Sequence, residues 1–200
     1  MPSTVPLSTR ATENIEEGDH WTPLVNALSD PYSEANPDGT VIMGLAENSM
    51  MHEQVAKHIT SNFEVDTAQH FTYGYGPQGS LRLRAALAGF FNDRFKALRP
   101  TKAEEFLITS GVSGMIDSLT WCLCNEGEGI MFPRPLYTGF RNDVPTRSRG
   151  KLVPVSLARE DGSVVLDDMF DTSRSVECLE KAREESERNG VKIKAVMITK

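Results

Sequence analysis

A short run of small residues near the middle of the chain has the composition of a phosphate-binding turn. Ser110 and Gly111 follow a β-like run over residues 105–109, and a helical pattern begins at Val112. The first turn of a helix presents backbone N–H groups that lack intrahelical partners, and the positive end of the helix dipole favours an anion there. Ser113 adds a hydroxyl donor to the same turn. The spacing therefore predicts a phosphate site, with a simple tight turn as the alternative explanation.

Two further candidates follow β-like runs elsewhere in the chain. Tyr137 comes soon after the run at 130–132, and its flat ring is suited to stacking on a planar cofactor. Glu47 follows a shorter run over residues 41–43. Because open α/β sheets bind ligands at the carboxyl ends of their strands, we expect Tyr137 to lie beside the same crevice as the phosphate site. Taken singly, Tyr137 also fits a core position, and Glu47 also fits an acidic residue favoured at a helix start.

Two familiar motifs fail because of their surroundings. Residues 74–79 match the pattern G-x-G-x-x-G, but dinucleotide binding requires a strand directly before it, and residues 66–72 do not have a strand pattern. Residues 111–114 are Gly-Val-Ser-Gly, which is one residue out of step with the G-x-S-x-G turn of serine hydrolases. A glycine-rich loop leading into a helix is the simpler interpretation of residues 74–79.

The histidines and cysteines do not indicate a metal site or a disulfide framework. His52 and His58 lack the i,i+4 spacing of a zinc-binding helix. Cys122 and Cys124 are two residues apart on an expected helix, so their side chains diverge. Together with Cys178 they make an odd count, which is not typical of a disulfide-stapled protein. We therefore expect no bound metal and a reducing, cytoplasmic location.

Charge and hydropathy exclude several classes of partner. The 28 acidic residues outnumber the 21 basic ones and give a net charge of −7, which argues against nucleic acids and anionic membranes. No apolar run approaches the length of a membrane span. The first 21 residues also lack the apolar core of a signal peptide. These features indicate a soluble, intracellular protein.

The periodicity of apolar residues predicts helices that alternate with strands. Residues 195–198 are apolar on both faces, which is typical of a buried parallel strand. This alternation predicts an α/β fold with a mostly parallel sheet. The expected helices span residues 22–29, 51–63, 80–98, 112–124 and 174–188, and the expected strands span residues 41–43, 105–109, 130–132, 151–157 and 193–199.

Four motifs, in this order along the chain, resemble the pyridoxal-phosphate-dependent class I/II aminotransferase family. The resemblance is strongest to its 1-aminocyclopropane-1-carboxylate synthase-like branch, and it runs from about residue 20 to the end of the chain. The Gly-Leu-Ala-Glu-Asn stretch is specific to that branch, whereas the other motifs occur across the family. The motifs are Asn-Pro-Asp-Gly at 36–39 with Met-Gly-Leu-Ala-Glu-Asn at 43–48, the Tyr/Gly loop leading into 83–88, Thr-Ser-Gly-Val-Ser-Gly at 109–114, and Pro-Leu-Tyr-Thr-Gly-Phe at 135–140.

The resemblance implies a partial fold type I aminotransferase-like large domain with a mostly parallel sheet, plus an N-terminal arm. Residues 1–40 would form the arm and a small-domain segment, and residues 41–200 the N-terminal part of the large domain that binds pyridoxal 5'-phosphate, in truncated form. The family relationship further implies an amino-acid substrate and a homodimer.

The resemblance also implies roles for individual residues. The cofactor phosphate would be held by Val112 and Ser113, with Gly111 shaping the turn, and Tyr137 would stack on the pyridine ring. The substrate side would be lined by Ala46 and Glu47. A tyrosine of the glycine-rich loop, Tyr73 or Tyr75 with Tyr73 preferred, would reach the cofactor of the partner subunit.

The chain departs from the family at its reactive lysine, which forms a Schiff base with the cofactor. None of the eight lysines has the serine-rich context of that residue, so no catalytic residue is assigned and the chain is expected to be inactive in amino-group transfer or the related eliminations. A non-catalytic remnant that binds partner chains is the first alternative. A nucleotide-binding α/β domain that uses the glycine-rich loop is the second.

Overall fold

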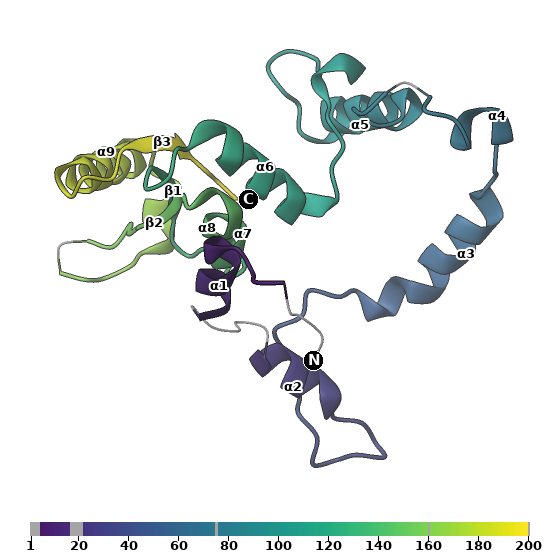
Figure 1. Cartoon of the computed structure of the whole chain (residues 1–200), viewed down its shortest axis with the longest axis horizontal. Coiled ribbons are helices and arrows are strands. Elements are labelled where there is room, and N and C mark those ends of the chain that lie inside the picture. Colours follow the sequence, from purple (N-terminus) through teal and green to yellow (C-terminus); the bar gives the residue numbers. More distant parts are fainter. Residues whose placement is uncertain (1–4, 17–21, 75, 160, 200) are drawn as a thin grey trace. The chain divides into compact units, whose positions relative to one another are not determined.

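The computed structural model describes residues 5–16, 22–74, 76–159 and 161–199 (Figure 1). The chain divides into two compact units, Met1–Thr72 and Tyr73–Lys200. The domain boundary predicted after residue 40 falls inside the first unit and stays a prediction. Among the described residues, no helix is both long and apolar enough to cross a membrane.

The first unit is built from short helices with exposed faces. The predicted helix over residues 22–29 is confirmed, and the one over 51–63 lies within one residue of its predicted ends. The strand predicted over residues 41–43 is wrong. Val41 and Met43 are 66% and 91% exposed, and without a neighbouring strand an extended segment forms no hydrogen-bonded ladder. The helices are α1 (Thr9–Glu16), α2 (Thr22–Ser29), η1 (Ser49–Met51), α3 (His52–Asn62) and α4 (Thr67–His70).

The second unit contains a three-stranded parallel sheet in the order β2-β1-β3. The predicted strands at 130–132, 151–157 and 193–199 are confirmed, with shorter bounds for the last two. The position of β3 in the sheet differs from the prediction. It is an edge strand rather than a buried one, and its Val196 is 41% exposed. The strands are β1 (Gly129–Pro133), β2 (Lys151–Val155) and β3 (Ile193–Val196).

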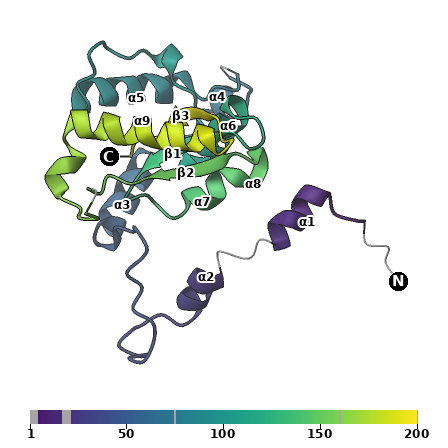
Figure 2. The same ribbon diagram turned by 90° about the vertical axis from the view of Figure 1, so that its left-hand side faces the viewer.

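Helices cover the sheet and connect its strands. The longest, α9, packs against all three strands (Figure 2). Its first turn is capped by Asp171, whose carboxylate accepts a hydrogen bond from the backbone N–H of Arg174 at 2.7 Å. Such caps satisfy donors that the helix itself leaves free. The helical elements are α6 (Gly111–Leu123), α7 (Phe140–Asp143), α8 (Pro145–Ser148), η3 (Leu166–Met169) and α9 (Thr172–Arg188).

The core of the second unit lies on one face of the central strand β1. Ile130 and Phe132 are each 1% exposed, and the rings of Phe132 and Phe140 are 5.1 Å apart. Strand alternation places Met131 on the opposite face, where it is 3% exposed. The buried cluster comprises Ile116, Cys124, Ile130, Phe132, Phe140 and Val144.

Two elements precede this sheet in the second unit, helix α5 (Leu81–Arg94) and the short η2 (Ala103–Glu105). Ser80 caps α5 as predicted, with its hydroxyl accepting from the N–H of Leu83 at 3.4 Å. The helix ends at Arg94 rather than near residue 98, because Lys96 adopts a left-handed conformation with φ of 48°. Aromatic rings of Phe90, Phe91, Phe95 and Phe106 pack against one another over this segment.

Candidate active site

The turn that opens α6 has the geometry of an anion site. Gly111 has a φ of +75°, which an L side chain rarely adopts, and its N–H donates to the carbonyl of Thr109 at 2.9 Å. Ser110 precedes the helix but its side chain makes no capping hydrogen bond. Val112 is 72% exposed and Ser113 is exposed, so both residues of the first turn are accessible from outside the unit. Uncapped N–H groups and a serine hydroxyl are the donors that a phosphate requires.

The strand predicted just before this turn, over residues 105–109, is wrong. Residues 106–109 belong to neither a helix nor a strand, because the described neighbours of β1 in the sheet are β2 and β3 alone. A single backbone bond, from the N–H of Ile108 to the carbonyl of Gln78 at 3.1 Å, ties the segment to the glycine-rich loop. The predicted start of α6 is confirmed, but the strand predicted to precede it is absent from the described residues.

Helix α6 is instead fixed by its inner face and by α8. Ile116 and Thr120 are 2% and 0% exposed. The guanidinium of Arg147 donates from Nε to both carboxylate oxygens of Asp117, at 2.9 and 2.8 Å, and lies 4.7 Å from the centre of the Trp121 ring. The hydrogen bonds from Arg147 to Asp117 raise the pKa of the guanidinium, which therefore stays charged at neutral pH. The helix and its open first turn are therefore held against the core.

Tyr137 follows the carboxyl end of β1 and presents an open aromatic face. Its ring is 62% exposed and packs edge-to-face on Phe140, with the ring centres 5.4 Å apart. The position of the Tyr137 ring requires glycine at residue 139, because a Cβ there would collide with the ring. Phe140 and Ile116 belong to one buried cluster, so the same core supports Tyr137 and the first turns of α6.

The glycine-rich loop before α5 is organised by a buried arginine. Arg84 is 6% exposed, and its guanidinium donates to the carbonyls of Gly79 and Ala103, at 3.1 and 3.3 Å, and to Oε1 of Gln78 at 3.2 Å. Gly79 has a φ of +94° and lies against Ile108, which a Cβ would meet at 2.6 Å. Arg84 thus links the loop to the segment that leads into α6.

Sequence reasoning assigned no role to Arg84. Arg84 and Ala88 are i,i+4 neighbours on one face of α5, and only the structure shows that this face is buried. The apolar residues Leu83 and Phe90 of the same helix are 45% and 53% exposed. A charged residue on the buried face of a helix is rarely tolerated without partners, and this one has three acceptors.

The remaining predicted site residues that the structure describes are all exposed. Tyr73 is fully exposed and its carbonyl accepts from the N–H of Gly76 at 3.1 Å, while Tyr75 lies outside the described residues. Ala46 and Glu47 belong to the first unit, where both are exposed. Glu47 lines an open groove along α3. Their approach to α6 and Tyr137 stays a prediction.

The three cysteines differ in exposure, with Cys122 exposed, Cys178 half-buried and Cys124 buried. Cys124, at the end of α6, is buried, and this burial raises the pKa of its thiol. A neutral buried thiol packs as a small apolar side chain and is a poor nucleophile. Within the described ranges, no group of three or more His, Cys, Asp or Glu residues is arranged to hold a metal ion.

Comparison with solved structures identifies the fold. The chain superimposes on an archaeal alanine:glyoxylate aminotransferase with a TM-score of 0.61 and 20% identity, covering 96% of this chain and 43% of that one. A single mutant of Thermus thermophilus aspartate aminotransferase gives a TM-score of 0.53 and 19% identity over 88% of this chain and 42% of that one. The partial fold type I aminotransferase-like architecture is therefore confirmed.

Comparison of sequences identifies the family. Relatives include 1-aminocyclopropane-1-carboxylate synthase 6 of *Oryza sativa* subsp. *japonica*, 27% identical over 90% of this chain and 34% of that protein. A probable aminotransferase, sirI of *Leptosphaeria maculans*, is 29% identical over 76% of this chain and 36% of that protein. The chain thus spans about a third of the length of these relatives. The model of aminotransferase class I and II matches residues 40–199, and the chain belongs to this family.

Proposed function

We propose that this chain supplies the phosphate and ring supports of a pyridoxal-phosphate-dependent, aminotransferase-like site that acts on an amino acid. The single observation that carries the proposal is the open first turn of α6, where no side chain caps the helix and Val112 and Ser113 follow a Gly111 with positive φ. Tyr137 supplies an exposed ring after the adjacent strand, supported by Phe140. Phosphate donors and an aromatic face are the two features that a phosphorylated pyridine needs from its site.

Each residue has one physical task in this proposal. Backbone N–H groups of Val112 and Ser113, with the Ser113 hydroxyl, bind the phosphate, and Gly111 gives the turn the conformation that exposes them. Tyr137 orients the ring by stacking. When bound, the cofactor supplies an electron sink for the substrate α-carbon. Ala46 and Glu47 are proposed to line the amino-acid side, as in the synthase-like branch.

The partner subunit and the cellular location are also proposals. Tyr73 is proposed to reach the cofactor site of a second copy of the chain, because its side chain is fully exposed. A cytoplasmic location agrees with the free state of Cys122, Cys124 and Cys178. The reactive lysine of the family has no counterpart among the eight lysines, so these 200 residues alone are proposed to bind without turnover.

Binding of 4'-deoxypyridoxine 5'-phosphate tests this proposal. The probe keeps the ring and phosphate but lacks the aldehyde, so adducts with surface lysines cannot mimic binding. We expect saturable binding, followed by tryptophan fluorescence, and no binding of 4'-deoxypyridoxine without the phosphate. Loss of one hydrogen bond to the anion in Ser113→Ala should weaken binding about tenfold.

Two controls separate the proposed function from its alternatives. Ser118→Ala removes a hydroxyl from the same helix, one that donates instead to the carbonyl of Gly114 at 2.8 Å, and should leave binding unchanged. Binding of NAD without binding of the pyridoxine phosphate would favour the nucleotide-binding alternative. Failure to bind either probe would favour a non-catalytic remnant.

A further inference from the structure

A cavity of about 580 Å³ lies at the carboxyl ends of β1 and β2. Arg134 follows β1 directly, and its backbone N–H donates to the carbonyl of Val155, the last residue of β2, at 2.9 Å. The cavity volume falls in the range of small-molecule sites, which is roughly 300–1,000 Å³. Leu136 and Thr138 line it, whereas the intervening Tyr137 points to Phe140 instead. The cavity is therefore separate from the face proposed to stack on the cofactor.

Two arginines give this cavity a positive lining. Arg134 and Arg141 both line it, and neither side chain has an ion pair or hydrogen bond within the described part of the chain. Among the described lining residues none is acidic. The whole chain carries a net charge of −7, whereas the two unpaired guanidinium groups make this cavity locally positive.

The rest of the lining is mostly apolar. Leu152 comes from β2, Leu157 follows that strand and is 7% exposed, and Val164 also lines the cavity. Apolar walls with a few polar groups are typical of sites that orient a small molecule by its head group. The geometry suits a ligand with an apolar body and a charged end.

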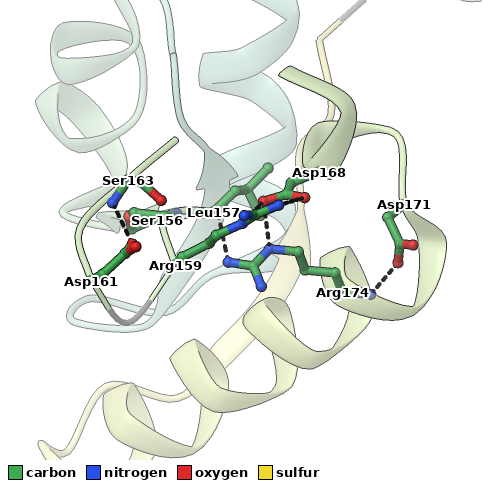
Figure 3. Close-up of polar contacts among 9 residues, drawn as sticks. Ser156, Leu157, Arg159, Asp161, Ser163, Asp168, Asp171 and Arg174 are labelled. Atoms are coloured by element: carbon green, nitrogen blue, oxygen red, sulfur yellow. Dashed lines mark hydrogen bonds and ion pairs between the residues drawn. The ribbon is translucent and has the colours of Figure 1, made fainter. Parts of the chain in front are cut away.

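The outer wall of the cavity is held in place by an ionic network. Asp168 accepts from Arg159 at 2.7 and 3.0 Å, and Nε of Arg174 lies 3.4 Å from the same carboxylate (Figure 3). Arg174 also donates from Nη2 to the carbonyl of Leu157 at 3.3 Å. Figure 3 shows both arginines converging on Asp168 beside the loop that follows β2. The loop is thus fastened to α9 and η3, and the cavity is preformed.

We propose that this cavity binds a small organic anion, with an oxyanion head group on the two arginines and an apolar body against the leucines. Guanidinium groups pair with carboxylates and with phosphates through paired N–H donors, so either head group fits the same chemistry. The proposal does not depend on the cofactor, because none of its residues belongs to the α6 turn.

Chemical-shift mapping on the ¹⁵N-labelled 200-residue chain tests the proposal. The probes are phenylacetate, phenyl phosphate and the neutral 2-phenylethanol. We expect saturable shifts at Leu136, Thr138 and Leu157 with at least one anion, and none with the alcohol. The tighter anion identifies the head group. Shifts confined to Gly111–Ser113, or no saturable shift in the cavity, would overturn the proposal.

Substitutions of the arginines supply the second readout. Arg134→Ala and Arg141→Ala should each weaken the anion about tenfold, since hydrogen bonds to charged groups contribute that much. Lys151→Ala removes one positive charge from the opposite end of β2 and should leave binding unchanged. Equal weakening by Lys151→Ala would show that general charge, rather than this cavity, attracts the probe. Each variant must keep the dispersed amide spectrum of the parent, which excludes unfolding as the cause.

Discussion

Nε of Arg84 donates a hydrogen bond to the carbonyl oxygen of Gly79 at 3.1 Å, so helix α5 holds the loop that precedes it. The same guanidinium reaches the carbonyl of Ala103, which precedes the segment leading into α6. One buried side chain therefore connects the glycine-rich loop, which carries Tyr73, to the approach to the proposed phosphate turn. The connection makes Arg84 a positioning residue rather than a binding one.

Replacing Arg84 with Met should loosen both segments. The substitution leaves the carbonyls of Gly79 and Ala103 without their donor, and buried groups without partners cost about 1–3 kcal/mol. Urea unfolding should show this loss, and hydrogen exchange should accelerate at Ile108, whose N–H bonds to the loop. Arg82→Met, on the exposed side of the same helix, is the matched control and should change neither measurement.

Gly79 should not tolerate a side chain. Alanine at φ of +94° is strained, and its Cβ would lie 2.6 Å from Ile108, so we expect a loss of about 1–3 kcal/mol. Gly89→Ala, in the middle of α5 with open space around it, should instead stabilise the protein by about 0.5–1 kcal/mol. Thermal melts of the two variants should therefore move in opposite directions. A gain in stability for Gly79→Ala would show that the loop is free to rearrange.

The centre of the second unit should depend on Phe132. Its ring is 1% exposed and packs on Phe140, and truncation to alanine in such a core costs about 3–5 kcal/mol. Phe170→Ala removes a ring that is 79% exposed and should leave the free energy of unfolding nearly unchanged. Urea unfolding of both variants measures the contrast. A small effect of Phe132→Ala would mean that this sheet is not the stable core.

The strands of the sheet were predictable because their apolar residues have neighbours to pack against. Ile130, Met131 and Phe132 are consecutive apolar residues of a central strand, and each is buried on one face or the other. Residues 105–109 have a similar β-like pattern, but their pairing depends on strands elsewhere in the fold. A local pattern favours an extended segment, and only long-range contacts decide whether that segment joins a sheet.

The proposed site shows the same division between local and long-range information. The small residues Ser110, Gly111 and Ser113 are sufficient to predict an open helix start, because this property depends on the first turn alone. The role of Arg84 depends on carbonyls five residues before it and 19 residues after it. The positive cavity depends on a loop whose position is fixed by Asp168, a residue with no distinguishing pattern around it.

That loop should respond to acid. Hydrogen bonds from Arg159 hold the pKa of Asp168 below its ordinary value of 3.8. Because the folded pKa is the lower one, the contribution of this network to stability is fully present above pH 3.8 and is lost as pH falls through the folded value. The difference in unfolding free energy between the parent and Asp168→Asn should therefore be largest near neutrality and shrink in this acidic window.

Urea unfolding from pH 7 to pH 3 measures this difference. Asp167→Asn removes the adjacent exposed carboxylate, which has no ion pair within the described residues, and its effect should be small at every pH. In Asp168→Asn, hydrogen exchange at neutral pH should also accelerate at Leu157, Arg159 and Ser163, because Arg159 loses its charged partner. If exchange in this loop is unchanged, the cavity wall is held by other contacts, and the network beside it is incidental.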